Sequence, residues 1–206
     1  MKVKFVLRII IAVCVAGFIV TRIISVNAPW ASRKAKYFEI GETVALERTL
    51  STGETVHNGD ITILADQPTI IDVNRLPDVN VEYTDPLLSS GNAHAAWAIL
   101  IPLTISNETA RAISLPLMDF NLQSGAWTNG TDPNLFEAIN PNVSMVSQLA
   151  AHSTLHVTMP FIVYDITCPS YTDFQNMAKK NYELLLSLLP NRCSIVFETK
   201  LINASK

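Results

Sequence analysis

Residues 95–106 read AAWAILIPLTIS and form the longest apolar strand candidate in the chain. Large apolar side chains recur at every second position, which is the period of a β-strand with one buried face. They are Trp97, Ile99, Ile101, Leu103 and Ile105. Pro102 removes one backbone donor, so we expect it at a sheet edge or a bulge. The stretch predicts a long strand with Trp97 in the core.

Shorter runs rich in β-branched residues surround this stretch, and turn signals separate them. Typical turn signals are Thr52-Gly53, Asn58-Gly59-Asp60 and Ser90-Gly91-Asn92. The predicted strands cover residues 43–47, 60–65, 69–73, 79–82, 113–122, 156–166 and 194–201. Short strands at even spacing are typical of an all-β fold, and they predict an antiparallel β-sandwich.

One segment departs from the strand pattern. Residues 171–189 place apolar side chains at helical spacing, including Phe174, Tyr182 and Leu185. A capping-box pattern opens the segment, and Pro190 closes it. We therefore expect one amphipathic helix inserted in the sandwich. A loop with one helical turn at 134–138 is expected over residues 129–147.

The N-terminal part is apolar and basic. Residues 9–20 read IIIAVCVAGFIV without a charge. With its apolar flanks this segment forms about 33 Å of helix, enough to cross a hydrocarbon core of about 30 Å. We expect a membrane anchor within residues 1–26 and a basic linker at 27–36. The anchor residues are Ile9, Ile10, Ile11, Val13, Val15, Phe18, Ile19 and Val20.

A cleaved signal peptide is the alternative for this leader. Residues 26–28 resemble a cleavage site, and cleavage after Ala28 would release a secreted protein. Pro29 is a poor context for that cut. A large domain after an anchor is translocated largely regardless of its charge, so we expect the body outside the cytoplasm.

The net charge of −3 over 206 residues hides a division. Up to Lys36 there are seven basic residues and no acidic one. The body, residues 37–206, holds the other eight basic residues and all 18 acidic ones, which gives it a charge of −10. An acidic body argues against nucleic acid as a partner. Its length suits one domain with a full core.

Several segments, taken in order, carry a family resemblance. They include Ile40-Gly41-Glu42-Thr43-Val44, Ile105-Ser106-Asn107-Glu108-Thr109 and Met118-Asp119-Phe120. In this order the segments resemble a family of small bacterial extracytoplasmic immunoglobulin-like domains, which often follow a lipoprotein signal or a membrane anchor. The resemblance covers roughly residues 38–166 and implies an immunoglobulin-like sandwich. Ala151-His152 departs from it, since the family prefers Pro-Gly there. It offers no catalytic residues.

Cys168 and Cys193 bracket the predicted helix. Outside the cytoplasm the two cysteines are candidates for a disulfide. A helix of this length separates its ends by about 25 Å, which argues against the bridge. Two free buried thiols are the alternative.

Enzyme and metal signatures are missing from the sequence. His152 and His156 lie about 13 Å apart on a strand, too far to share a metal. Asp60, Asp66, Asp72 and Asp78 recur every six residues but fall across turns without a calcium-loop pattern. No nucleophile elbow, zinc-protease motif or phosphate-binding loop is present. We expect no catalytic, cofactor-binding or metal site, and no enzyme.

These features predict a membrane-anchored extracytoplasmic module that binds another protein or serves a cell-envelope assembly. Trp127 lies in a polar loop and is a candidate contact. Phe174, Tyr182 and Leu185 are further candidates if the predicted helix stands free of its own domain. The alternatives are a secreted antigen-like protein, and a small-ligand receptor or enzyme without a known motif.

Overall fold

The computed structural model describes residues 15, 17–23, 25, 35–76, 84–188, 191–198 and 200–201. The chain divides into two compact units, Met1–Lys34 and Ala35–Lys206. In the first unit the described residues are helical, and Val15, Phe18, Ile19 and Val20 are exposed. The other predicted anchor residues, Ile9, Ile10, Ile11 and Val13, and the predicted strand at 79–82 lie outside the described residues. Within the described part of the chain, no helix is both long and apolar enough to cross a membrane.

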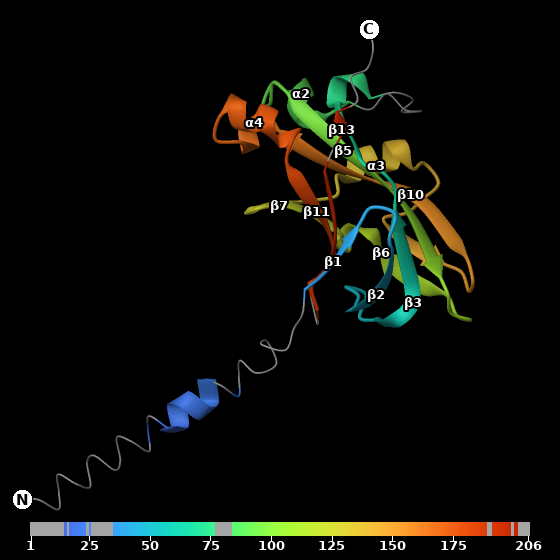
Figure 1. Ribbon diagram of the computed structural model, residues 1–206. Coiled ribbons are helices and arrows are strands. Elements are labelled where there is room, and N and C mark those ends of the chain that lie inside the picture. The colour runs from blue at the N-terminus through green and yellow to red at the C-terminus, as the bar shows by residue number, and fades with distance from the viewer. Residues whose placement is uncertain are drawn as a thin grey trace, which may run out of the picture. The chain divides into compact units, whose positions relative to one another are not determined.

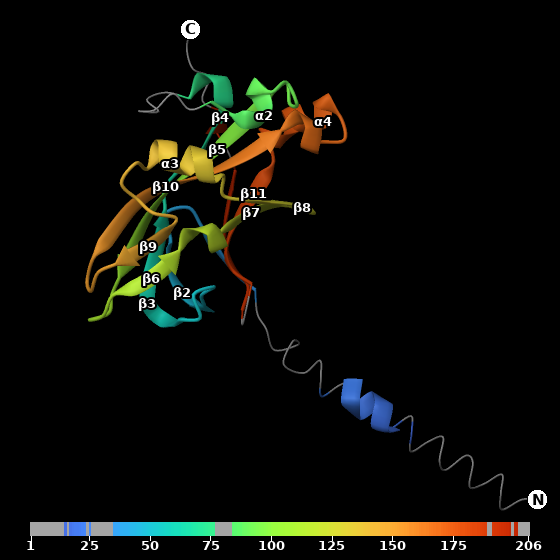
Figure 2. The ribbon, with the colours of Figure 1, turned by 180° about the vertical axis from the view of Figure 1, so that it is seen from behind.

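The second unit is a β-sandwich, as predicted (Figures 1 and 2). One sheet has the order β1 (Lys36–Glu39), β12 (Cys193–Glu198), β11 (Asn181–Ser187), β7 (Asn121–Ser124) and β8 (Trp127–Gly130). We call it sheet A. Its first strand, β1, begins inside the predicted linker and runs parallel to β12.

Sheet B is built around β5 (Ala96–Asn107). Its other strands are β13 (Lys200–Leu201), β4 (Thr69–Asp72), β3 (Thr55–Ala65), β2 (Thr43–Thr49) and β10 (Thr154–Tyr164). A separate ladder joins β6 (Ile113–Pro116) and β9 (Val146–Leu149). The short helices are η1 (Val73–Arg75), α2 (Pro86–Ser89), η2 (Leu117–Asp119), α3 (Pro133–Ile139), η3 (Asp165–Thr167) and α4 (Tyr171–Met177). The predicted helical turn at 134–138 corresponds to α3.

The predicted central strand is confirmed as β5. Its side chains from Ile99 to Ile105 are buried at every second position in the core between the sheets. Trp97 is half-buried and stacks on Phe174, with ring centroids 5.9 Å apart. The opposite face of β5 packs Ala96 and Ala98 into a second apolar cluster that includes Leu135 of α3. The long strand therefore separates two cores.

Pro102 lies in this central strand, so its predicted place at an edge or bulge was wrong. β10 pairs with β5 over nearly its whole length, while β4 and β3 share the other side in succession. Pro102 falls between their two registers, and its carbonyl accepts a hydrogen bond from Asp66 N at 3.0 Å. The nitrogen of a strand residue points the same way as its carbonyl. The missing N–H thus faces an interruption in the pairing.

The predicted helix over residues 171–189 was also wrong beyond its first two turns. Ser170 caps α4, which ends at Met177, and β11 follows after a short turn. The apolar residues of this segment fit both the helical period and the strand period. Packing selects the strand, because Tyr182, Leu184 and Leu186, at every second position, are all buried in the core. The Tyr182 hydroxyl donates to the Met177 carbonyl at 2.6 Å and ties the strand to the end of the helix.

Because α4 is shorter than the predicted helix, the two cysteines no longer bracket a single helix. Cys168 and Cys193 are both free thiols. Cys168 lies near Tyr182, whose pKa is raised by burial and by the nearby thiol. Cys193 pairs in register with Ser187 near the end of β11. The structure therefore holds the two cysteines as separate free thiols.

Asn107, in one of the segments that carry the family resemblance, has a structural role. Its side chain is buried and donates to the carbonyls of Arg111, Leu149 and Ala150. Its carbonyl oxygen accepts from the Thr109 backbone N–H and hydroxyl. One amide thus joins the turn after β5 to the turn after β9.

His152 occupies the position at which the resembled family prefers glycine. It has φ of 52°, the left-handed region that glycine adopts without cost. Among the described residues, it is the one non-glycine residue with positive φ. The preference for glycine at this position follows from the shape of the turn.

Candidate functional site

A cleft of about 400 Å³ opens where the edge strand β2 of sheet B meets β7 and β11 of sheet A. We call it the Met118 cleft. Its lining comes from β2, η2, β7, β11 and the residue after β11, and consists of Arg48, Thr49, Met118, Asp119, Asn121, Leu185, Ser187 and Leu188. Residues far apart in sequence therefore meet at one seam of the sandwich.

An ion pair closes the inner part of this cleft. Arg48 Nη2 donates to Asp119 Oδ2 at 2.8 Å, and Arg48 Nη1 donates to the Leu186 carbonyl at 2.8 Å. Asp119 also accepts from Ser51 N at 3.1 Å. The Arg48 and Asp119 side chains are only 14% and 13% exposed. The pair links β2 of one sheet to β11 and η2 beside the other.

Burial lowers the pKa of Arg48, and the Asp119 carboxylate opposes that shift. An arginine nevertheless stays charged in a protein at any ordinary pH. Removing either partner therefore leaves a charge in a poorly hydrated place, which is costly. The two ionisable groups of the Met118 cleft are occupied with each other, and their role is to hold the sheets together.

The rim of the cleft is apolar and exposed. The 3₁₀ turn η2 directs Leu117 and the following Phe120 into the core, which leaves Met118 outside with 52% of its surface exposed. Leu188 follows the end of β11 and is 59% exposed. The register of β11 on β12 shifts between Leu185 and Ser187, just before this residue. Two large apolar side chains thus flank an opening above the nearly buried Leu185.

Of the predicted contact residues, the structure brings one to this cleft. Leu185 lines its floor, while Phe174 and Tyr182 are buried in the main core. The predicted contact role of Phe174 and Tyr182 was therefore wrong, because the domain itself covers their side chains. Trp127 is half-buried and packs edge-on against Tyr182, with ring centroids 6.3 Å apart. Its polar loop is the short hairpin of β7 and β8.

Asp78, one of the aspartates considered for metals, lies outside the described residues. Among the described residues, no three His, Cys, Asp or Glu side chains gather closely enough to hold a metal ion. His156 Nδ1 instead shares a hydrogen bond with the Thr104 hydroxyl at 3.1 Å, on paired strands of sheet B.

A second group of ionisable side chains lies beside α2 and α3. Asp85 is buried, caps α2 and accepts from the Tyr164 hydroxyl at 2.8 Å. Asp132 caps α3, and its pKa is raised mainly by burial, with a smaller contribution from Asp85. These carboxylates organise helix starts and belong to neither sheet seam.

Comparison with known proteins identifies the family. The sequence profile described as a domain of unknown function (DUF5028) matches residues 35–193. The chain belongs to the DUF5028 family. The match covers nearly all of the sandwich, from the residue before β1 to the start of β12. Membership in a family of unknown function is thus established, while the immunoglobulin-like and extracytoplasmic assignments remain predictions.

Solved structures resemble the chain at low identity. A functionally unknown protein from Listeria monocytogenes EGD-e has 12% identity and a TM-score of 0.47, covering 79% of this chain and 91% of its own. An uncharacterized β-sandwich protein from Clostridium difficile 630 has 12% identity and a TM-score of 0.44, covering 81% and 97%. Neither is similar enough to lend its properties to this chain. A search of curated proteins found no match.

The sequence pattern does not indicate Met118, Leu188 or the Arg48–Asp119 pair as parts of one site. Met118 falls inside a predicted strand, and Leu188 falls inside the predicted helix. The Met118-Asp119-Phe120 segment is one of those that carry the family resemblance, so the sequence does mark this region. It does not indicate that β2 lies beside it and brings Arg48 to Asp119.

Proposed function

We propose that this protein is a membrane-anchored extracytoplasmic module that binds another cell-envelope protein through the Met118 cleft. The observation that carries the proposal is the pair of exposed apolar side chains, Met118 and Leu188, at the rim of one cleft. Exposed apolar clusters with a polar surround are typical of protein-binding surfaces, and methionine is enriched in them.

Binding without catalysis is the activity that this cleft supports. Its two ionisable residues bind each other, and Asp119 is further engaged by a backbone N–H. Thr49 and Asn121 supply polar groups beside the apolar rim, which is the usual composition of a protein interface. The mechanism is surface complementarity, with burial of Met118 and Leu188 providing much of the binding free energy.

The test is co-purification of the full chain from native membranes after chemical cross-linking. We expect the double variant Met118→Ser/Leu188→Ser to lose its cross-linked partner and to keep its thermal stability, because both side chains are already in contact with water. The matched control is Val146→Ser/Ile166→Ser, which removes two apolar side chains that are 38% and 55% exposed elsewhere. Equal loss of the partner in both variants would refute the assignment to this cleft.

The anchoring part of the proposal rests on the apolar and basic leader. Residues 9–20 carry no charge, and the flanking basic residues suit anionic head groups. We expect the native protein to remain in the membrane fraction with its leader intact. Intact-mass measurement decides the matter, since a species that begins at Pro29 would establish the secreted form.

A further inference from the structure

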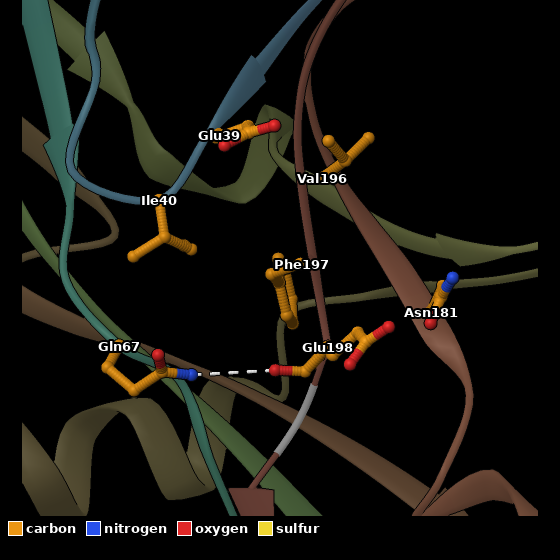
Figure 3. A pocket seen from close by; sticks show the side chains of 7 residues that line it. All are labelled: Glu39, Ile40, Gln67, Asn181, Val196, Phe197 and Glu198. Carbon is orange, nitrogen blue, oxygen red and sulfur yellow. Dashed lines mark hydrogen bonds between the residues drawn. The ribbon is translucent and has the colours of Figure 1, made fainter.

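A second cleft, of about 510 Å³, lies where β1 ends and the chain crosses from sheet A to sheet B (Figure 3). We call it the Glu198 cleft. Its lining residues are Glu39, Ile40, Gln67, Asn181, Val196, Phe197 and Glu198. It shares no residue with the Met118 cleft.

One wall of this cleft is the C-terminal end of β12, beyond the last residue that pairs with β1. The register of β1 on β12 runs from Lys36 with Cys193 to Glu39 with Val196, and Ile40 then leaves the sheet. Phe197 and Glu198 continue β12 beyond that point and pair with β11 on the other side. No described strand lies beside this edge of β12 beyond Val196, and of the two residues only Glu198 turns its backbone groups toward it.

The direction of the backbone groups at this edge follows from one hydrogen bond. Lys36 N donates to the Arg192 carbonyl, so that carbonyl faces β1. Backbone groups alternate sides along a strand, which turns those of Ser194, Val196 and Glu198 in the same direction. Among the described residues, the Gln67 side-chain amide donates to the Glu198 carbonyl at 3.5 Å, a long contact (Figure 3). An incoming extended segment would find an acceptor there.

The side chains around this edge define the chemistry of such a segment. Glu39 and Glu198 are exposed and bring two carboxylates to the cleft, and none of its described lining residues is basic. Ile40 and Phe197 form apolar walls between them (Figure 3). The favoured ligand is therefore positively charged and partly apolar.

We propose that the Glu198 cleft binds an extended peptide segment of a partner protein, in which lysine or arginine alternates with apolar residues. The segment continues the line of β1 along β12. Its basic side chains lie against Glu39 and Glu198, and an apolar side chain lies between Ile40 and Phe197. Strand addition of this kind takes affinity from the backbone and specificity from the alternating side chains. Charge complementarity selects this occupant over an acidic one.

The experiment uses the full chain in non-ionic detergent and a fluorescent probe, acetyl-Val-Arg-Val-Lys-Val-amide. We expect saturable binding in low salt, and binding about tenfold weaker to Glu39→Gln/Glu198→Gln. The control Glu47→Gln/Glu137→Gln removes the same charge from two exposed positions outside the cleft and should bind as the unchanged protein does.

Three results would overturn the proposal. The first is an absence of saturable binding to the unchanged protein. The second is an equal loss of affinity in both double variants, which would reduce the effect to net charge. The third is unchanged affinity for a probe that is N-methylated at alternate residues along either edge, because strand addition requires backbone donors. Both variants alter exposed side chains, so circular dichroism should show the same fold in each.

Discussion

The two clefts lie on seams of the same sandwich but differ in their charged side chains. In the Met118 cleft, Arg48 and Asp119 are nearly buried and bonded to each other. In the Glu198 cleft, two carboxylates are exposed and no described lining residue is basic. Charge holds the fold together at the first cleft and remains available for a ligand at the second. The rim of the first cleft offers apolar surface instead.

This difference indicates which residues carry stability and which carry recognition. Buried paired charges are poor contact residues, because a partner would have to compete with the existing ion pair. Exposed apolar or unpaired charged side chains contribute little to folding and remain open to partners. Single substitutions of each kind separate these roles.

The largest effect is expected from Asp119→Ala. It leaves the Arg48 guanidinium buried without its counter-charge and removes the acceptor of Ser51 N, so we expect a loss of about 3–5 kcal/mol in the free energy of unfolding. Chemical denaturation measures it. Glu198→Ala is the matched carboxylate from the other cleft and should change stability by less than about 0.5 kcal/mol. Similar losses from both variants would contradict the division between the clefts.

Asn107→Ala tests whether a neutral buried side chain contributes as much to the free energy of unfolding as the ion pair does. The substitution leaves three carbonyls and the Thr109 N–H without their side-chain partner. We expect a loss of about 2–3 kcal/mol, smaller than at Asp119. Denaturation curves of the two variants in one buffer compare them directly. A loss at Asn107 that exceeds the loss at Asp119 would mean that the hydrogen bonds of this buried amide stabilise the fold more than the ion pair does.

Asp132→Asn tests a carboxylate that burial penalises and that forms no ion pair with a described residue. A carboxyl pKa that is higher in the folded state means that folding favours the protonated form, so the charge of Asp132 costs stability at neutral pH and the cost fades as pH falls. Asparagine keeps the cap of α3 without the charge. We expect a gain below about 1 kcal/mol at pH 7 that shrinks on acidification. A gain independent of pH would contradict this explanation.

A gain of similar size is expected from His152→Gly. The turn before β10 requires a positive φ, and glycine adopts it without the cost that a Cβ carries. We expect a gain of about 0.5–1 kcal/mol, reduced by the greater freedom of glycine in the unfolded chain. Thermal denaturation should show a slightly higher Tm. A lower Tm would mean that the His152 side chain makes a stabilising contact.

The sandwich could be predicted from sequence because β5 carries its signal locally. Alternation from Trp97 to Ile105 requires no knowledge of partner strands. The segment after Ser170 could not be resolved in the same way. Its apolar residues fit a helix and a strand alike, and only contacts with β12 and β7 select the strand. Sequence periodicity alone does not contain those contacts.

The candidate site was less predictable than the fold, again for a physical reason. Leu185 was expected as a contact residue, but on a helix face, and it lines the Met118 cleft from a strand. Met118 is exposed because a single 3₁₀ turn interrupts the predicted strand there. A cleft between two sheets depends on side chains from strands that are distant in sequence. Neither cleft leaves a motif in any one segment.

The most direct measurement is photo-cross-linking in the native membrane, with a photoreactive amino acid placed at Leu188 or, as the control, at Ile166. Both positions are similarly exposed, and only Leu188 lines the Met118 cleft. We expect a defined cross-linked envelope protein from position 188, none from position 166, and loss of the product when Met118→Ser is added. Equal products from both positions, or none from position 188, would contradict partner binding through the Met118 cleft.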